Sequence, residues 1–157
     1  MDIHQFVVMT PVTTPEEAEQ LRGIRNDCKN FMTRDTGYIM EDQQQRWFKN
    51  LSSDIKIYLL HLVEHGVVSS SIGYGLIREE DGYSLISGGL LEQYRGKGFG
   101  TILFQYLLKN VNQEFPIRLE VLKNNTKAFL VYNKLGFRVY SDDGKVIKME
   151  YVYDSSI

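Results

Sequence analysis

The sequence has a single cysteine, Cys28, among its 157 residues, which excludes an internal disulfide framework and favours a reducing compartment. Its three histidines have no cysteine or acidic partner at the spacing of metal ligands, so we expect no metal site. No apolar run approaches the roughly 20 residues that cross a bilayer. The first ten residues carry an acid at position 2 and no long apolar stretch. We therefore predict no signal peptide, no membrane partner and a cytoplasmic location.

Positive charge is not in excess either. The 18 Lys and Arg residues stand against 20 Asp and Glu, giving a formal net charge of -2. This argues against a nucleic-acid partner, which usually requires a basic face, but it leaves room for one small basic pocket. Linkers, repeats and low-complexity segments are also missing, and the hydrophobic content of 43% is typical of a globular protein. We therefore expect one domain over residues 1–157.

Periodicity and turn residues predict the element order β-α-α-β-β-β-α-β-α-β-β. The first helix begins after Thr14, which forms a capping box with Glu17, and it ends near Cys28. The remaining elements are strands at 3–12, 54–64, 67–80, 83–91 and 117–122, helices at 41–51, 101–111 and 124–137, and a closing hairpin around Asp143-Gly144. This order predicts an α+β protein, with an α/β-type mixed sheet that has helices on both faces.

The segment Arg95-Gly96-Lys97-Gly98-Phe99-Gly100 lies between a predicted strand and an amphipathic helix. Glycines at a helix N-terminus let backbone N–H groups approach an anion closely, and the two cations add positive charge, so pyrophosphate is the expected ligand. The P-loop pattern fails because the lysine precedes the last two glycines. A dinucleotide loop remains an alternative, since Glu120 lies where a ribose-binding acid belongs, although three predicted antiparallel strands precede the loop. A plain glycine-rich turn is the structural alternative.

Two motifs together resemble the GNAT N-acetyltransferase superfamily. The glycine loop matches the family signature [RQ]-x-x-G-x-[GA] at Arg95–Gly100. Downstream, Asn125-x-x-Ala128-x-x-x-Tyr132-x-x-x-Gly136-Phe137 resembles the closing motif of the family. The resemblance covers residues 85–140 and implies the GNAT fold, a central, mixed and mostly antiparallel sheet whose fourth and fifth strands splay apart.

The resemblance also implies roles for particular residues. Acetyl-CoA is the expected cosubstrate, with its pyrophosphate on the N–H groups of the glycine loop. Leu90 and Leu91 are expected to offer backbone groups to pantetheine, and one of their N–H groups to polarise the thioester carbonyl. The implied cofactor-binding residues are Leu90, Leu91, Arg95, Gly96, Lys97, Gly98, Phe99, Gly100, Thr101, Asn125 and Tyr132.

Tyr132 is the candidate catalytic residue, because it occupies the position at which the family often carries a general acid for the leaving sulfur. Two structural alternatives remain open. Tyr132 has helical spacing from Ala128 and Leu135, which is also typical of a core tyrosine, and Asn125 is also a plain helix N-cap.

The general base is not identified by the sequence. The attacking amine must lose a proton, because an alkylammonium has a pKa near 10. The strand at 83–91 contains no acid, although Ser87 offers a site for a relay water. The remaining titratable candidates are interpreted as turn or strand-end residues: Glu79, Glu80, Asp81, His61 and His65.

The acceptor side is expected in residues 24–39, where arginines alternate with aromatic residues. The segment carries Arg25, Asn26, Arg34 and Asp35 among Phe31, Met32 and Tyr38. The run RN…M…I…Q…RWF, which begins at Arg25 and ends at Phe48, resembles acetyltransferases that act on nucleotide-linked amino sugars. The alternative is a loop followed by an amphipathic helix that buries Trp47 and Phe48.

The leading hypothesis is therefore an N-acetyltransferase for a primary amine of a small molecule, with a nucleotide-linked amino sugar as the favoured acceptor. A protein N-terminal or lysine acetyltransferase is the second hypothesis. A non-catalytic CoA-binding domain is the third, suggested by the missing strand-borne acid. By analogy with the family, the segment 146–157 is a candidate homodimer surface.

Overall fold

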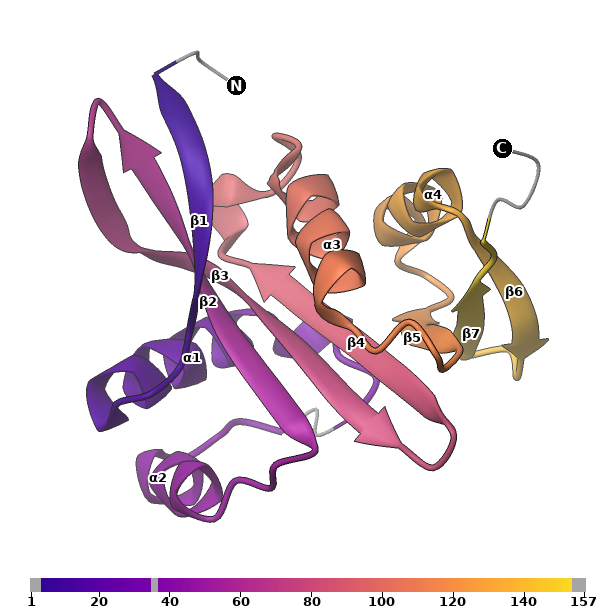
Figure 1. Ribbon diagram of the computed structural model, residues 1–157, viewed down its shortest axis with the longest axis horizontal. Helices are drawn as coiled ribbons and strands as arrows, with labels where there is room; N and C mark the ends of the chain where they lie inside the picture. The colour runs from indigo at the N-terminus through magenta and orange to yellow at the C-terminus, as the bar shows by residue number, and fades with distance from the viewer. Residues whose placement is uncertain (1–3, 35–36, 154–157) are drawn as a thin grey trace.

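Seven strands form one mixed sheet in the computed structural model, which describes residues 4–34 and 37–153 (Figure 1). The strands are β1 (Gln5–Pro11), β2 (Ile55–Glu64), β3 (Val67–Glu80), β4 (Tyr83–Leu90), β5 (Ile117–Leu122), β6 (Phe137–Asp142) and β7 (Val146–Tyr151). The helices are α1 (Pro15–Asp27), α2 (Glu41–Lys49), α3 (Phe99–Asn110) and α4 (Thr126–Leu135), with 3-10 turns at Lys29–Phe31 and Glu92–Tyr94. Ile3, Asp35, Thr36 and the end of the candidate dimer segment, 154–157, lie outside the described residues.

The sheet confirms the predicted splay. The strand order is β1-β2-β3-β4-β5-β7-β6, and every neighbouring pair is antiparallel except β4 and β5. That parallel pair matches only Ser84 with Ile117 and Leu85 with Arg118, although β4 continues to Leu90. Beyond Leu85 the two strands therefore separate, which leaves the facing edges of both strands free of sheet hydrogen bonds.

Helices cover both faces of the sheet, as predicted. On one face, α1 and α2 pack over β2 and β3 and enclose a core cluster that contains Leu21, Ile24 and Leu59. On the other face, α3 and α4 enclose a larger cluster around Leu103 and Phe137. Figure 1 shows α1 and α2 together beside β2, whereas α3 runs along β4 on the opposite side. None of the helices in the described residues is long and apolar enough to span a membrane.

Local signals account for the ends of the helices. The capping box between Thr14 and Glu17 starts α1, as predicted. Gly136, with a φ of 114°, ends α4 in the left-handed conformation that favours glycine. α3 begins at Phe99, two residues before the predicted start, because Gly98 already acts as its N-cap. α2 ends at Lys49 instead of residue 51.

Two glycines at the end of β4 let helices close on the sheet from opposite sides. A Cβ on Gly88 would lie 2.9 Å from Cδ2 of Leu103 on α3. A Cβ on Gly89 would lie 2.7 Å from Sγ of Cys28, at the end of α1. The pair Gly88-Gly89 thus brings α1 and α3 close to the same edge, where β4 leaves β5.

Candidate active site

One cavity of about 1010 Å³ occupies the splay between β4 and β5. Its wall includes Leu103 and Phe104 from α3, which cover one face of the sheet. It also includes Arg25 from α1 and Phe31 from the following turn, on the other face. Since residues from both faces line a single space, the cavity extends through the splay from one face of the sheet to the other.

The glycine loop forms one mouth of this cavity. Gly96 and Gly98 line it and have φ values of 73° and 89°, which a residue with a side chain adopts only with strain. A Cβ at either position would meet no atom within 4 Å, so the space in front of the loop is open. Gly98 has no side chain to cap α3, and the first N–H groups of the helix therefore remain available to an anion at its positive end.

The free edge of β4 supplies further backbone groups. The N–H of Leu91 donates to the carbonyl of Ile72 at 2.8 Å, so Leu90 and its partner Gly73 form a non-hydrogen-bonded pair. The N–H and C=O of Leu90 consequently point toward the splay. By the same alternation those of Gly88 do so as well. The N–H of Leu91 is used within the sheet, and Leu90 is the residue whose N–H faces the cavity.

Arg95 joins the loop to α1. Its Nε donates to the carbonyl of Leu90 at 2.9 Å, and its Nη2 donates to Asp27 Oδ2 at 3.1 Å. The guanidinium also lies 4.9 Å from the ring centroid of Phe31. The sequence predicted a cation aimed at a ligand, whereas this guanidinium is anchored to β4 and α1. Its contacts fix the end of β4 relative to the acceptor side.

Tyr132 lies on the cavity wall and packs against the core at the same time. Its ring meets Phe104 edge-on with centroids 4.8 Å apart and Phe137 at 6.3 Å. Burial, with a smaller effect of Tyr74, raises the pKa of the Tyr132 hydroxyl above its ordinary value. The phenol is therefore protonated throughout the neutral range. The two sequence interpretations of this residue, core and site, are compatible in the structure.

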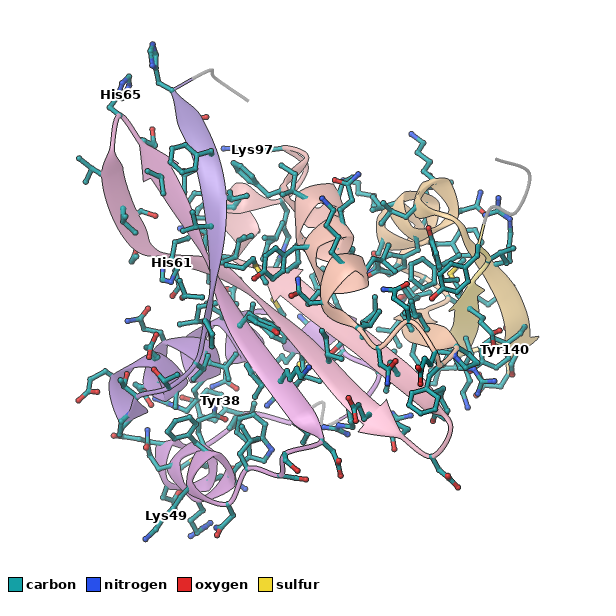
Figure 2. All side chains as sticks on the ribbon, viewed as in Figure 1. Tyr38, Lys49, His61, His65, Lys97 and Tyr140 are labelled. Atoms are coloured by element: carbon teal, nitrogen blue, oxygen red, sulfur yellow. The ribbon has the colours of Figure 1, made fainter. Side chains whose placement is uncertain are left out.

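Most of the predicted site residues meet at the cavity. Asn125 does so while its Oδ1 accepts the N–H of Ala128 at 3.4 Å as the N-cap of α4. The predicted residues on the wall are Leu90, Arg95, Gly96, Gly98, Gly100, Thr101, Asn125 and Tyr132. The structure does not bring Leu91, Lys97 and Phe99 to the wall: Lys97 is exposed (Figure 2), and Phe99 is 4% exposed in the core.

Glu120 is an acid on the wall that the sequence interpretation assigned only to a dinucleotide site. It follows the last β4–β5 pair by two residues and lines the cavity. It accepts hydrogen bonds from Arg34 Nη2 at 2.8 Å and Thr33 Oγ1 at 3.0 Å. Burial raises the pKa of the Glu120 carboxyl, but these hydrogen bonds outweigh it and hold the pKa below its ordinary value. Its position on the strand at the start of the splay was the signal that could have identified Glu120 as a residue of the cavity wall.

The other candidates for the general base lie in different parts of the molecule, and only some of them are near the cavity. Ser87 lines the cavity. Glu80 accepts from Arg34 at 3.2 Å at the far end of β3. His61 and His65 lie on β2 and in the β2–β3 turn, on the side of the sheet away from α4 (Figure 2). The structure thus brings Ser87 to the reaction space and leaves both histidines outside it.

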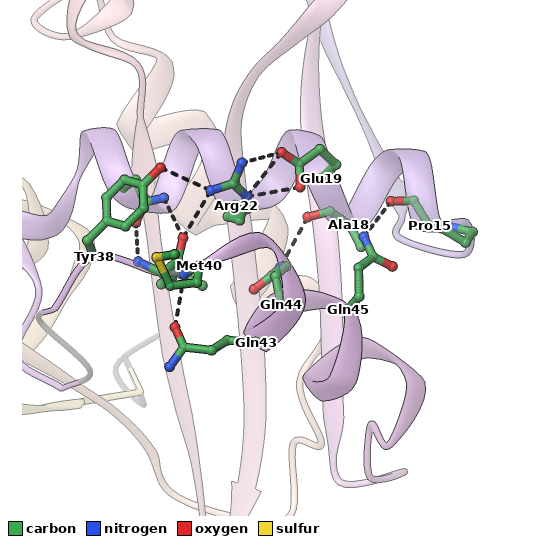
Figure 3. Close-up of polar contacts among 11 residues, drawn as sticks. Pro15, Ala18, Glu19, Arg22, Tyr38, Met40, Gln43, Gln44 and Gln45 are labelled. Atoms are coloured by element: carbon green, nitrogen blue, oxygen red, sulfur yellow. Dashed lines mark hydrogen bonds and ion pairs between the residues drawn. The ribbon is translucent and has the colours of Figure 1, made fainter.

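On the expected acceptor side, polar contacts anchor α2 to α1 (Figure 3). Gln44, a buried amide, donates to the carbonyl of Ala18 at 3.1 Å, and Arg22 donates to the Tyr38 hydroxyl at 3.1 Å. These contacts enclose a second cavity of about 310 Å³. Its lining residues are Arg25, Gly37, Tyr38, Ile39, Gln43, Gln44, Trp47 and Arg78. Trp47 packs on the core, as the alternative interpretation expected, and also lines this space.

Comparison with known proteins agrees with this geometry. A family model described as "Acetyltransferase (GNAT) family" matches residues 18–137. The chain belongs to the GNAT acetyltransferase family. It is 30% identical over 104 residues to a protein of Saccharolobus solfataricus named N-alpha-acetyltransferase, covering 52% of this chain and 62% of that protein. A protein of Sulfurisphaera tokodaii with the same name is 34% identical over 83 residues, covering 43% and 50%. The matches thus span about half to three fifths of these relatives.

Solved structures share the GNAT fold with this chain. A domain from Methanocaldococcus jannaschii superposes with a TM-score of 0.79 at 14% identity and covers 93% of this chain and 99% of that one. A point mutant of the spermidine N-acetyltransferase SpeG of Vibrio cholerae has a TM-score of 0.73 at 15% identity and covers 92% of both chains. At these identities the likeness supports the fold alone.

Proposed function

We propose that this chain is an acetyl-CoA-dependent N-acetyltransferase that acts on a primary amine. The observation that carries the proposal is the single cavity that crosses the sheet at the splay. An acetyl donor and an amine acceptor that enter from opposite faces meet there without crossing each other. The fold family, the glycine loop and the free β4 edge all support this assignment.

The donor mouth fits acetyl-CoA. A cavity of about 1010 Å³ accommodates a long cosubstrate. The N–H groups at the start of α3, behind Gly98, suit a pyrophosphate, and no Cβ blocks their approach. The β4 edge at Gly88 and Leu90 suits the amides of pantetheine. When bound, acetyl-CoA supplies an acetyl thioester, and its carbonyl must be polarised before the amine can attack it.

Three protein groups serve the transfer in this proposal. The Leu90 N–H points toward the splay and donates to the thioester carbonyl oxygen, where it stabilises developing negative charge. Tyr132, protonated because burial raises its pKa, donates a proton to the leaving sulfur. Ser87 holds a water that carries the proton of the amine toward solvent. Glu120 is not one of these three groups, because its lowered pKa and its ion pair with Arg34 make it a weak base.

A small-molecule acceptor is the class we favour. The second cavity, about 310 Å³ with aromatic and amide walls, has room for a compact polar molecule. An amino sugar, free or nucleotide-linked, is one such acceptor. Protein N-terminal acetylation is the second candidate, and it is favoured by the names of the two relatives that match part of this chain. Lysine acetylation and a purely CoA-binding role remain as outcomes of the experiment.

The test has two stages. The first measures the melting temperature with acetyl-CoA, NAD or ATP, because a ligand at a hundred times its Kd stabilises a protein by about 2.7 kcal/mol, a rise of several degrees. We expect a rise with acetyl-CoA alone. The second follows thiol release from acetyl-CoA with amino sugars, small amines, and peptides with a free N-terminus or a free lysine. Binding without thiol release from any acceptor would leave a CoA-binding domain, and no binding would refute the proposal.

A further inference from the structure

Two arginines on the proposed acceptor side each bury a guanidinium nitrogen that has no hydrogen-bond partner among the described residues. The Nε atoms of Arg25 and Arg78 are buried, and neither has a hydrogen-bond partner. Within residues 4–34 and 37–153, no acidic side chain forms an ion pair with either guanidinium. Burying an ionised donor without an acceptor is costly, because the group loses its hydration and gains nothing in return. Such a pair is stabilised when an anion binds.

The other arginines of the cavity differ in this respect. Arg34 pairs with Glu120 at 2.8 Å, and Arg95 pairs with Asp27 at 3.1 Å. Their charges are balanced within the fold. Among the described lining residues, the unpaired positive charge of the cavity is therefore concentrated at Arg25 and Arg78, apart from Lys127 on the donor side.

Both unpaired arginines stand where the two cavities meet, because each lines the large cavity and the small one. Arg25 extends from α1 over the ring of Trp47, 5.7 Å from its centroid, and lies beside the Tyr74 hydroxyl. Arg78 lies on β3 opposite Leu85, the last residue of β4 that pairs with β5. The two guanidiniums therefore come from different elements and converge at the closed end of the splay.

We propose that Arg25 and Arg78 bind an oxyanion, a phosphate or a carboxylate, that the acceptor amine carries. Planar guanidiniums recognise both groups through paired N–H donors. On β3, Arg78 is four residues beyond Tyr74, and Arg25 lies beside the Tyr74 hydroxyl. This inference rests on the proposed function, which it extends to an acidic class of acceptor.

The binding test uses inorganic phosphate and protein saturated with CoA, so that the pyrophosphate site is already filled. Calorimetry should show saturable phosphate binding that weakens about tenfold in Arg25→Gln and in Arg78→Gln. Arg25→Lys and Arg78→Lys keep the charge and should retain part of the affinity. Arg46→Gln removes an exposed cation of α2 and should change nothing. Absent binding, or equal binding in all variants, would overturn the proposal.

The kinetic test compares matched amines with and without an anion. The pairs are glucosamine 6-phosphate with glucosamine, for phosphate, and 4-aminobutyrate with butylamine, for carboxylate. We expect kcat/KM to favour one or both acids by about tenfold in the wild type, and the ratio of kcat/KM for the acid to that for its neutral partner to fall to about one within Arg25→Gln and within Arg78→Gln. Equal kcat/KM values for acidic and neutral amines in the wild type would refute the proposal that the acceptor carries the anion. If phosphate binds as expected but no amine is acetylated, the anion site stands and the proposed function fails.

Discussion

The two halves of the cavity recognise ligands by different means. The donor half, from the glycine loop to Asn125, presents mainly backbone N–H groups and the positive end of α3. The proposed acceptor half presents side chains of α1, α2 and β3, among them Arg25 and Arg78, which line both cavities. Backbone donors suit a group that never changes, whereas long side chains are replaced easily during evolution. Under the proposed function, this contrast suits a constant donor and an acceptor that differs among enzymes of one fold.

Ion pairs connect the two halves across the cavity. Arg95 ties the end of β4 to Asp27 at the end of α1. Arg34 ties the segment after α1 to Glu120 on β5 and to Glu80 on β3. Residues 28–34 are therefore held over the splay from both sides. Substitutions at Tyr132, Gly98 and Glu120 each perturb one half, or one of these connections, and leave the other intact.

The largest effect is expected where the halves meet. Tyr132→Phe removes the proposed acid and should lower kcat about a hundredfold, with an unchanged Kd for acetyl-CoA. Since burial raises the pKa of Tyr132 above its usual value of 10.0, its ionisation should not limit the wild-type rate below about pH 10. Tyr151→Phe is the control, because Tyr151 packs on the same Phe137 but lies off the cavity wall. Equal rates for both variants would assign Tyr132 to packing alone.

A smaller effect is expected from the donor half. Gly98→Glu forces a side chain onto a φ of 89° and adds a negative charge beside the helix N-terminus. We expect a loss of about 2 kcal/mol, or about thirtyfold in the Kd for acetyl-CoA measured by calorimetry. Gly144→Glu is the control, because it puts the same side chain on a similar φ of 92° in the β6–β7 turn and so causes similar backbone strain away from the glycine loop. It should lower the melting temperature without weakening acetyl-CoA binding. An unchanged Kd in Gly98→Glu would contradict the anion role of the loop.

The smallest effect is expected from the connection through Glu120. Glu120→Gln weakens the contact with Arg34, but Arg34 retains its ion pair with Glu80. The free energy of unfolding at pH 7 should therefore fall by only about 1 kcal/mol. The folded state holds the pKa of Glu120 below its ordinary value of 4.5, so this contribution is present above that pH and disappears as pH falls through the folded pKa.

Urea unfolding of both proteins at several pH values tests this linkage. The difference between wild type and Glu120→Gln should be full at pH 7 and should close in acid. Glu79→Gln, an exposed carboxylate of the β3–β4 hairpin, is the control and should show no difference. A difference that persists below the folded pKa would mean that Glu120 acts through packing and not through its charge.

Local signals in the sequence predicted much of the donor half. Gly98 and Gly136 are required by backbone conformation, so their roles can be inferred from the sequence alone. Outside the donor half, the capping box at Thr14 identified the start of α1 in the same way. The alternating pattern of Ile117–Leu122 predicted β5 with its observed bounds. The splay itself followed from the family resemblance and not from periodicity.

The acceptor half could not be predicted, because its contacts join residues far apart in the sequence. Nothing near Arg95 in the sequence shows that Asp27 will hold its guanidinium. Nothing near Arg78 shows that its Nε will have no hydrogen-bond partner in the part of the chain that the structure describes. Glu120 gained its role only when Arg34 reached it. The strand register also determines which of Leu90 and Leu91 has its N–H toward the splay. The Ile72 carbonyl accepts the N–H of Leu91, so the N–H of Leu90 faces the splay.

The central claim is that the donor enters from the α3–α4 face and stops at the splay. Hydrogen exchange followed by mass spectrometry, with and without acetyl-CoA and with NAD as the control, tests it most directly. The account predicts slower exchange in peptides covering 86–90, 96–101 and 125–132, and unchanged exchange in 38–49, the α2 side. Protection concentrated at 38–49, or the same pattern with NAD, would contradict it.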